Sequence, residues 1–153
     1  MSSSAGPQPL VDLCRTLRGR LGGAACSVAR LEGAALEYVA ADGEGAAEIV
    51  GTRLDGGRGV AGFVVAAAQS VYLDEVAAAP RFARDVAEST GYVPTGILAV
   101  PVVGDDGILG VLTVLDPSDR SLGDPTTWLA EAGDTAADVA ELLEGGAPEQ
   151  AGQ

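Results

Sequence analysis

The side chains that could do chemistry in this chain are two cysteines, nine arginines and twenty-two carboxylates, with no histidine and no lysine. Without imidazole or lysine, a Ser-His-Asp site, a Cys-His site, a Schiff-base lysine and a P-loop lysine are all excluded. Two cysteines alone cannot hold a structural zinc ion or an iron–sulfur cluster, and a histidine-ligated haem is excluded as well. Carboxylate chemistry, single-thiol chemistry and non-catalytic binding remain.

The two cysteines lie twelve residues apart: Cys14 is on the apolar stripe of the first predicted helix, and Cys26 is at the start of the first predicted strand. This setting is typical of small buried apolar side chains, whereas a reactive thiol needs a nearby cation or a helix N-terminus. One disulfide is possible in a domain of this size, but nothing in the sequence requires it. We therefore expect two free thiols.

Two short motifs could indicate a cofactor or a metal ion. The segment 57–62 matches G-x-G-x-x-G, but a dinucleotide site also needs a βαβ unit and an acidic residue about twenty positions further on. Asp74 follows only twelve residues after Gly62, so a tight turn into a packed helix is favoured. The acidic stretches at 105–106 and 116–119 do not follow the calcium-loop pattern. We expect no cofactor and no metal ion.

The net charge of −13 argues against a nucleic-acid partner, because phosphate neutralisation supplies most of that affinity, and against an anionic membrane surface. The longest apolar run, 60–68, has nine residues, whereas a membrane-spanning helix needs about twenty, and the N-terminus lacks the pattern of a signal peptide. We expect a cytoplasmic protein. Its arginine-only usage is typical of a high-GC bacterial genome.

The elements that must position any site form an antiparallel α+β pattern, in which hairpins dominate and helices do not alternate with strands. The expected order is helix, three strands, helix, strand, short helix, two strands and helix, over residues 9–21, 24–31, 34–41, 49–54, 60–69, 70–73, 82–87, 97–103, 108–115 and 124–143.

Two strand features are specific enough to test. Asp105-Asp106-Gly107 between two β-branched runs predicts a hairpin turn, although Pro101 then needs a bulge or an unpaired position. In the strand 34–41, alternation predicts that Leu36, Tyr38 and Ala40 share one face.

Five segments in this order and spacing resemble the GAF domain family over residues 10–143. They are Gly57–Val65, Asp74 with Ala79–Phe82, Thr90–Tyr92, Ile97–Pro101 and Gly107–Leu112. The resemblance implies a PAS-related central antiparallel sheet of about six strands, with the terminal helices on one face and a pocket segment on the other. It also explains Pro101, since Ala-Val-Pro is common in that strand of the family. We expect a disordered leader at 1–8, one GAF domain at 9–144 and a flexible tail at 145–153.

The resemblance also implies a ligand pocket under residues 74–95. Expected lining and polar contact residues are Phe63, Asp74, Arg81, Phe82, Tyr92, Thr95 and Ala99. The residues that mark cyclic-nucleotide, bilin and haem-binding members are missing, and residues 60–143 lack the pocket cysteines of the GAF-type methionine sulfoxide reductases. We therefore expect no catalytic residue and no enzyme activity.

The two terminal helices are predicted to form a homodimer. The first carries a net charge of +2 and the last, 124–144, a net charge of −6, and each has an apolar stripe. The stripes are Leu10, Cys14, Leu17 and Leu21 on one helix and Leu129, Ala132, Ala136, Val139 and Leu143 on the other.

Three functions remain open at this point. The first is a sensor that binds an unidentified small molecule and signals to a separate partner protein through its terminal helices. The second is a structural interaction module with an empty pocket. The third is an enzyme that uses carboxylates such as Asp74 and Asp85, for which the spacing supports no specific reaction.

Overall fold

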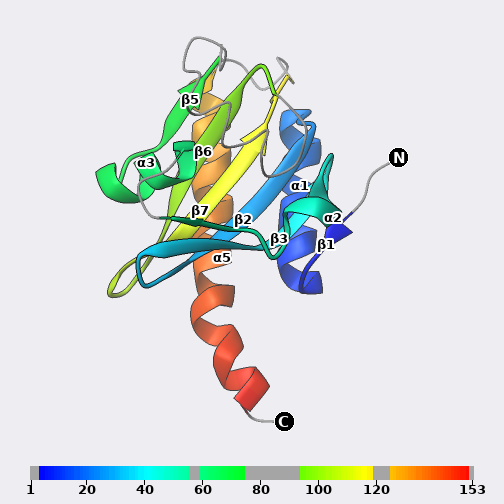
Figure 1. Ribbon diagram of the computed structural model, residues 1–153. Coiled ribbons are helices and arrows are strands. Elements are labelled where there is room, and N and C mark those ends of the chain that lie inside the picture. The colour runs from blue at the N-terminus through cyan, green and yellow to red at the C-terminus, as the bar shows by residue number, and fades with distance from the viewer. Residues whose placement is uncertain (1–3, 56–58, 75–93, 119–124, 152–153) are drawn as a thin grey trace.

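The computed structural model of the chain describes residues 4–55, 59–74, 94–118 and 125–151 (Figure 1). Its elements are β1 (Ser4–Ala5), α1 (Gln8–Leu21), β2 (Ala25–Glu32), β3 (Ala35–Gly43), α2 (Ala46–Ile49), β4 (Arg53–Asp55), α3 (Gly59–Ala67), β5 (Val71–Leu73), β6 (Ile97–Gly104), β7 (Gly107–Leu115) and α5 (Pro125–Ala151). The predicted short helix at 82–87 lies outside the described residues.

The strands form one antiparallel sheet in the order β1-β3-β2-β7-β6-β5, and β4 pairs with β3 on the same edge as β1. The predicted α+β class with a central antiparallel sheet is therefore confirmed. The described residues give seven strands rather than about six. One of them is β1, in which Ser4 and Ala5 pair with Asp42 and Ala41 inside the stretch expected to be a disordered leader.

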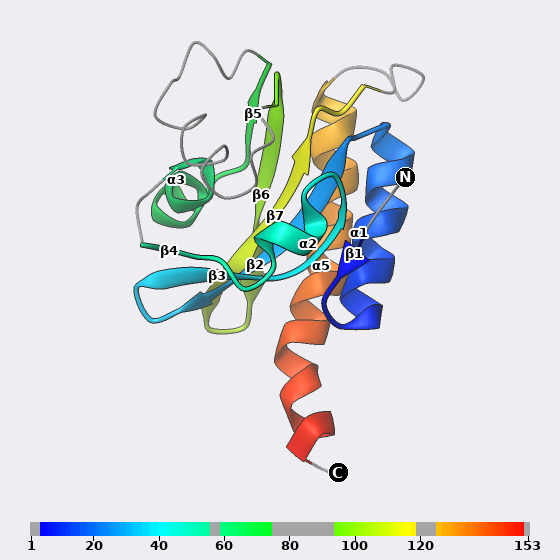
Figure 2. The same cartoon turned by 45° about the vertical axis from the view of Figure 1, so that its right-hand side comes forward.

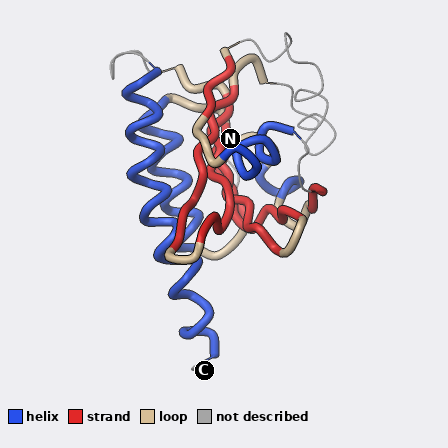
Figure 3. Tube along the Cα trace, turned by 90° about the vertical axis from the view of Figure 1, so that its left-hand side faces the viewer, coloured by secondary structure: helices blue, strands red, loops and turns tan. Residues whose placement is uncertain are grey.

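The sheet separates two layers of helices. Helices α1 and α5 lie side by side on one face, while α2 and α3 lie on the other, as the two views in Figures 2 and 3 show. Helix α1 has Pro9 in its first turn, where the missing N–H leaves no hydrogen bond unmade. It ends at Gly22, whose φ of 64° is the left-handed conformation that glycine adopts most easily.

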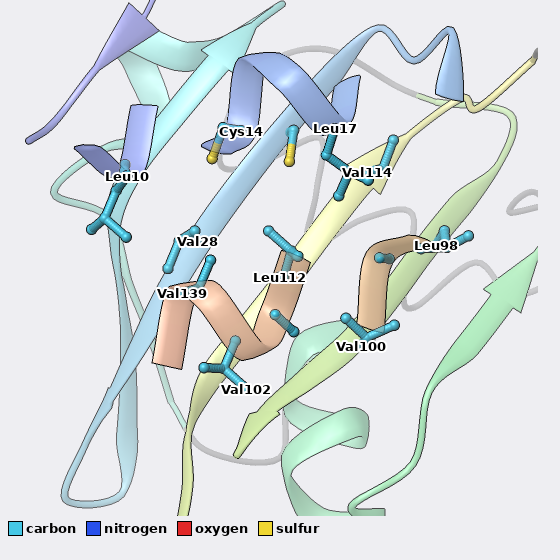
Figure 4. Packing of buried hydrophobic residues seen from close by; sticks show 14 of the residues in the cluster. Leu10, Cys14, Leu17, Val28, Leu98, Val100, Val102, Leu112, Val114 and Val139 are labelled. Atoms are coloured by element: carbon cyan, nitrogen blue, oxygen red, sulfur yellow. The ribbon is translucent and has the colours of Figure 1, made fainter. Parts of the chain in front are cut away.

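Alternation along the strands supplies a core on each face of the sheet. On β6, Leu98, Val100 and Val102 contact the cluster under α1 and α5 (Figure 4), whereas Ile97 and Ala99 belong to the cluster under α3. Helix α5 contributes Trp128, which is fully buried and meets Tyr72 edge-on with 5.5 Å between ring centroids. The core under α3 and the core under α1 and α5 are therefore built from opposite faces of the same strands.

A β-bulge changes the register between β2 and β3. Val28 pairs with Ala40 and Ala29 pairs with Tyr38, so Val39 is the extra residue. As a result, Leu36 and Tyr38 lie in the cluster under α3, but Ala40 lies in the cluster under α1. The prediction that all three share one face is wrong for Ala40, because simple alternation takes no account of a bulge.

Two element boundaries and one detail of strand register also differ from the predictions. The expected strand at 49–54 is a short helix, α2, followed by the three-residue strand β4. Helix α5 does not end at Gly145-Gly146 but continues to Ala151, since glycine in a helix costs only about 1 kcal/mol relative to alanine. Pro101 pairs with Val111, and the register shift comes one residue later, between Val102 and Val103.

Candidate functional site

A pocket lies between the sheet and the start of α3, and it has about 40 Å³ of space for the centres of water-sized molecules. A cavity needs roughly 10–15 Å³ on this measure to hold one water molecule, so it has room for a small ligand group. The described lining residues come from β2, β3, α2, β4, α3, β6 and β7. They are Ser27, Tyr38, Ile49, Leu54, Gly59, Val60, Ala61, Ile97, Thr113 and Leu115.

Two hydroxyl groups lie next to each other on the floor of this pocket. Ser27 on β2 and Thr113 on β7 are direct cross-strand partners, and Thr113 is flanked on its other side by Ala99 of β6. Neither side chain has a hydrogen-bond partner among the described residues, and neither oxygen is sealed from the cavity. The floor therefore offers two free hydroxyls within an apolar surface.

The first turn of α3 forms one wall of the pocket. Val60 and Ala61 are buried there, and the helix starts at Gly59 with a φ of 66°, which a side chain other than glycine rarely adopts. Phe63, on the same helix, points outward and is exposed. Gly59 therefore turns the chain into the wall, while residues 57 and 58 of the predicted tight turn lie outside the described residues.

Tyr38 holds the opposite wall in place through its backbone. Its N–H donates to the carbonyl of Thr52 at 3.0 Å, and its carbonyl accepts from the N–H of Gly51 at 2.8 Å. These bonds fix the connection between α2 and β4, from which Ile49 and Leu54 face the pocket. No carboxylate or guanidinium lines the described part of the pocket, so its chemistry is that of an uncharged binding cavity.

The structure brings together few of the predicted pocket residues. Ala99 is fully buried on the pocket face, beside Thr113, but it does not line the cavity. Phe63 and Asp74 are exposed and lie outside the lining, and Thr95 is exposed as well. Arg81, Phe82 and Tyr92 lie outside the described residues.

The sequence analysis missed the residues that actually form the floor, Ser27, Tyr38 and Thr113. A signal for two of them is present. Thr113 interrupts the apolar run Gly110 to Leu115, and Ser27 interrupts β2 between Cys26 and Val28. A lone hydroxyl in an otherwise buried strand indicates a polar contact, but only the register shows that the two are neighbours.

The expected contact residue Thr95 has a different role. The Asp116 side chain accepts hydrogen bonds from the N–H groups of Thr95 and Gly96, both at 2.8 Å through Oδ1. Asp116 itself has a φ of 52°, and its N–H donates to the carbonyl of Gly96. Asp116 therefore fastens the start of β6, next to Ile97 of the pocket, to the end of β7.

On the opposite face, one buried carboxylate anchors α1 to the sheet. Asp42 of β3, whose side chain is 1% exposed, accepts from Nε of Arg18 at 2.7 Å and from Nε of Arg15 at 3.3 Å. Between the helices, Arg20 pairs with Glu131 of α5 at 2.9 Å. The basic face of α1 is thus engaged within the chain.

The predicted dimer stripes are also largely engaged within the chain. Of the nine stripe residues, all but Leu129 and Leu143 are buried in the single chain, in the core between the two helices and the sheet. Leu129 and Leu143 are partly buried against the same core. Seven of the nine residues are therefore already covered before any second copy is present, and the homodimer stays a prediction.

Three properties of the described residues bear on cofactors and location. They contain no group of three or more residues able to hold a metal ion. They also contain no helix that is long and apolar enough to cross a membrane. Both cysteines are free and buried.

A sequence model of the GAF domain family matches residues 10–145. The chain belongs to the GAF family. Similar solved structures agree with this. They include the GAF domain of A. aeolicus nlh2 in an inactive state (TM-score 0.73, 16% identity, covering 90% of this chain and 83% of that one). No curated protein sequence matches the chain.

Two further GAF structures have different contexts. One is the GAF domain of a phosphoenolpyruvate-protein phosphotransferase, ptsP, from Coxiella burnetii (TM-score 0.70, 21% identity, covering 92% and 85% of the two chains). The other is the free methionine-R-sulfoxide reductase from Neisseria meningitidis with its substrate (TM-score 0.70, 21% identity, covering 90% and 77%). At these identities the likeness shows the shared fold.

The prediction of no enzyme activity is wrong, because it does not follow from the residues that this GAF chain lacks. The Neisseria reductase, and a second one from Staphylococcus aureus, are enzymes built on the same fold. A GAF domain therefore can carry catalysis, and the lack of histidine and lysine excludes particular catalytic sites only. The GAF family is nevertheless mostly regulatory.

Proposed function

We propose that this GAF domain is a sensory or regulatory module that binds a small molecule in the pocket between α3 and the sheet. The observation that carries the proposal is the pair Ser27 and Thr113, whose free hydroxyls lie side by side in an otherwise apolar cavity. Apolar walls with a few well-placed polar groups are typical of small-molecule sites, since the walls supply affinity and the polar groups orient the ligand.

The described lining favours an uncharged ligand. Burying a charge without a partner costs several kcal/mol, and no charged side chain is available in this part of the lining to offset it. A hydroxyl, carbonyl or amide group can instead exchange its hydrogen bonds with water for bonds to Ser27 and Thr113 at little loss. The expected ligand has a compact apolar body and one such polar group.

The sheet offers a route from the pocket to the terminal helices. Ile97, Thr113 and Leu115 line the pocket. Their neighbours along the same strands, Leu98 on β6 and Val114 on β7, pack in the core under α1 and α5. A ligand that shifts β6 or β7 therefore also changes the packing of the helices. In our proposal a separate partner protein in the cytoplasm reads this change.

The alternative is a structural module whose pocket stays empty. Native mass spectrometry of the freshly purified chain separates the two functions. A bound ligand adds a fixed small mass that is lost under denaturing conditions, and the pocket-filling variant Ala61→Leu does not carry it. If the wild-type chain and Ala61→Leu both show only the mass of the bare chain, and incubation with cell extract adds no mass to either, the structural module is supported instead.

We further propose the homodimer, with a narrower contact than the sequence predicts. Because most stripe residues are buried within the chain, a second copy can reach only partly exposed positions such as Leu129 and Leu143. Sedimentation equilibrium measures this directly. A dimer that is weakened by Leu143→Glu supports the contact, and a monomer at high micromolar concentration contradicts it.

A further inference from the structure

The two cysteines of the chain lie in the core between the sheet and helices α1 and α5, on the opposite face of the sheet from the pocket. Cys14 comes from α1 and Cys26 from β2, and both are at most 1% exposed within the same cluster of buried residues. Figure 4 shows Cys14 directed from α1 toward the strands. The two thiols therefore belong to different elements that pack against each other.

The hydrogen bonds around α1 explain why the thiols meet. Arg18 lies one helical turn after Cys14, so the two side chains share a face of α1. Arg18 bonds to Asp42, and Asp42 is the cross-strand partner of Cys26. The turn of α1 that carries Cys14 is thereby held directly over Cys26.

The thiols also interact with each other. A hydrogen bond with Cys14, together with burial, raises the pKa of the Cys26 thiol well above its usual value. Because the thiolate is the reactive form, Cys26 is unreactive while α1 is in place. Reaction requires that α1 first moves away from the sheet.

We propose that Cys14 and Cys26 form a latent dithiol site, which small disulfide oxidants convert to a disulfide that locks α1 onto β2. The proposal does not depend on a ligand in the pocket. Because both thiols are at most 1% exposed, the reaction proceeds from a locally opened state in which α1 has moved off the sheet.

The chemistry is two successive thiol–disulfide exchanges with an oxidant such as oxidised glutathione. In the opened state, the thiolate of one cysteine attacks the oxidant and releases one glutathione thiol, which leaves a mixed disulfide. When α1 closes, the second cysteine attacks that mixed disulfide and releases the second glutathione thiol. The protein loses two protons and two electrons, and the oxidant is reduced to two thiols.

The carboxylate of Asp42 controls the rate in this scheme. Its bonds to Arg15 and Arg18 hold α1 closed, so weakening them increases the opened fraction. Arg15 is half exposed and its distance to Asp42 is the longer one. Arg15→Gln is therefore a mild change that keeps the fold and tests the same contact as the stronger Asp42→Asn.

The test incubates the native full-length chain with oxidised glutathione. We expect an intramolecular disulfide, seen as the loss of two hydrogen atoms in mass, the loss of both thiols and a Cys14–Cys26 cross-linked peptide. The cross-link closes a short loop and constrains the unfolded chain, so the melting temperature is expected to rise by about 5–10 °C. Arg15→Gln is expected to oxidise about 2–5-fold faster, in proportion to its larger opened fraction.

The single variants Cys14→Ala and Cys26→Ala serve as controls, because each can form only a stable glutathione adduct. Three results contradict the proposal. The first is a wild-type chain that keeps its glutathione adducts and forms no disulfide. The second is thiols that react only at the rate of global unfolding, with the same rate in Arg15→Gln as in the wild type. The third is an oxidised chain whose melting temperature does not rise.

Discussion

Ser27 and Thr113 face each other directly across β2 and β7, and both line the pocket between the sheet and α3. Each hydroxyl lacks a partner among the described residues. Both hydroxyl oxygens remain accessible from the cavity, so each can exchange a hydrogen bond to water for one to a ligand. Such an arrangement is expected of a site that completes its hydrogen bonds with a ligand.

The variant Thr113→Val keeps the shape of the side chain and removes its hydroxyl. We expect the free energy of unfolding to stay unchanged or to rise by up to about 1 kcal/mol, because an unpartnered polar group is lost. Ligand affinity is expected to fall about 5–10-fold. Urea unfolding and ligand titration measure the two effects. The exposed control Thr16→Val is expected to change neither, and an unaltered affinity in Thr113→Val contradicts the role of the floor.

The variant Asp42→Asn removes the buried charge that two arginines of α1 share. We expect a loss of about 2–3 kcal/mol in unfolding free energy, because the buried, charge-assisted contact of 2.7 Å between Asp42 and Nε of Arg18 loses its negative charge. Asp12→Asn is the matched control, since Asp12 is exposed and 3.7 Å from Arg15. It is expected to cost less than about 0.5 kcal/mol. Equal losses in the two variants, measured by urea unfolding, disagree with the assigned anchor.

Asp116 combines a left-handed backbone with two accepted hydrogen bonds, and three substitutions separate these contributions. Asp116→Asn keeps an acceptor oxygen and tolerates the backbone, so it is expected to cost about 1 kcal/mol or less. Asp116→Gly loses the hydrogen bonds without backbone strain, and we expect it to lower the free energy of unfolding by about 1–2 kcal/mol. Asp116→Ala loses the hydrogen bonds and adds backbone strain, and we expect a total loss of about 3 kcal/mol. Thermal unfolding that ranks Ala above Gly in stability refutes this partition.

Gly110 of β7 pairs with Arg30 of β2 and lies against the β2 backbone. A Cβ atom at this position collides with the carbonyl oxygen of Ala29, so Gly110→Ala must separate two central strands. We expect a loss of more than about 3 kcal/mol, or an unfolded chain, by circular dichroism and urea unfolding. Gly133→Ala is the control. It has open space around it on α5 and is expected to stabilise the chain by up to about 1 kcal/mol.

Periodicity predicted the large elements of the fold correctly, because they depend on local sequence. The Asp105-Asp106-Gly107 turn and the two β-branched runs around it fix the β6–β7 hairpin, and the stripes of α1 and α5 fix which face each helix buries. The bulge at Val39 and the pairing of β1 depend on the partner strand, which no local pattern reports. They were therefore missed.

The pocket was harder to predict for the same reason. The resemblance to the GAF family directed attention to residues 74–95, whereas the described lining comes from seven elements spread between Ser27 and Leu115. Of the predicted residues, Ala99 lies on the pocket face of the sheet but outside the described lining. The neighbours Ser27 and Thr113 are 86 positions apart, and only the order β2-β7 brings them together.

The central claim is that the pocket under α3 binds a small molecule, and a thermal-shift screen of uncharged metabolites tests it most directly. The screen compares the wild-type chain with Ala61→Leu, which fills the cavity, and with Ala66→Leu, which adds the same atoms to the exposed side of α3. We predict that at least one compound raises the melting temperature of the wild type and of Ala66→Leu, but not that of Ala61→Leu. No shift with any compound, or an equal shift in all three proteins, contradicts the claim.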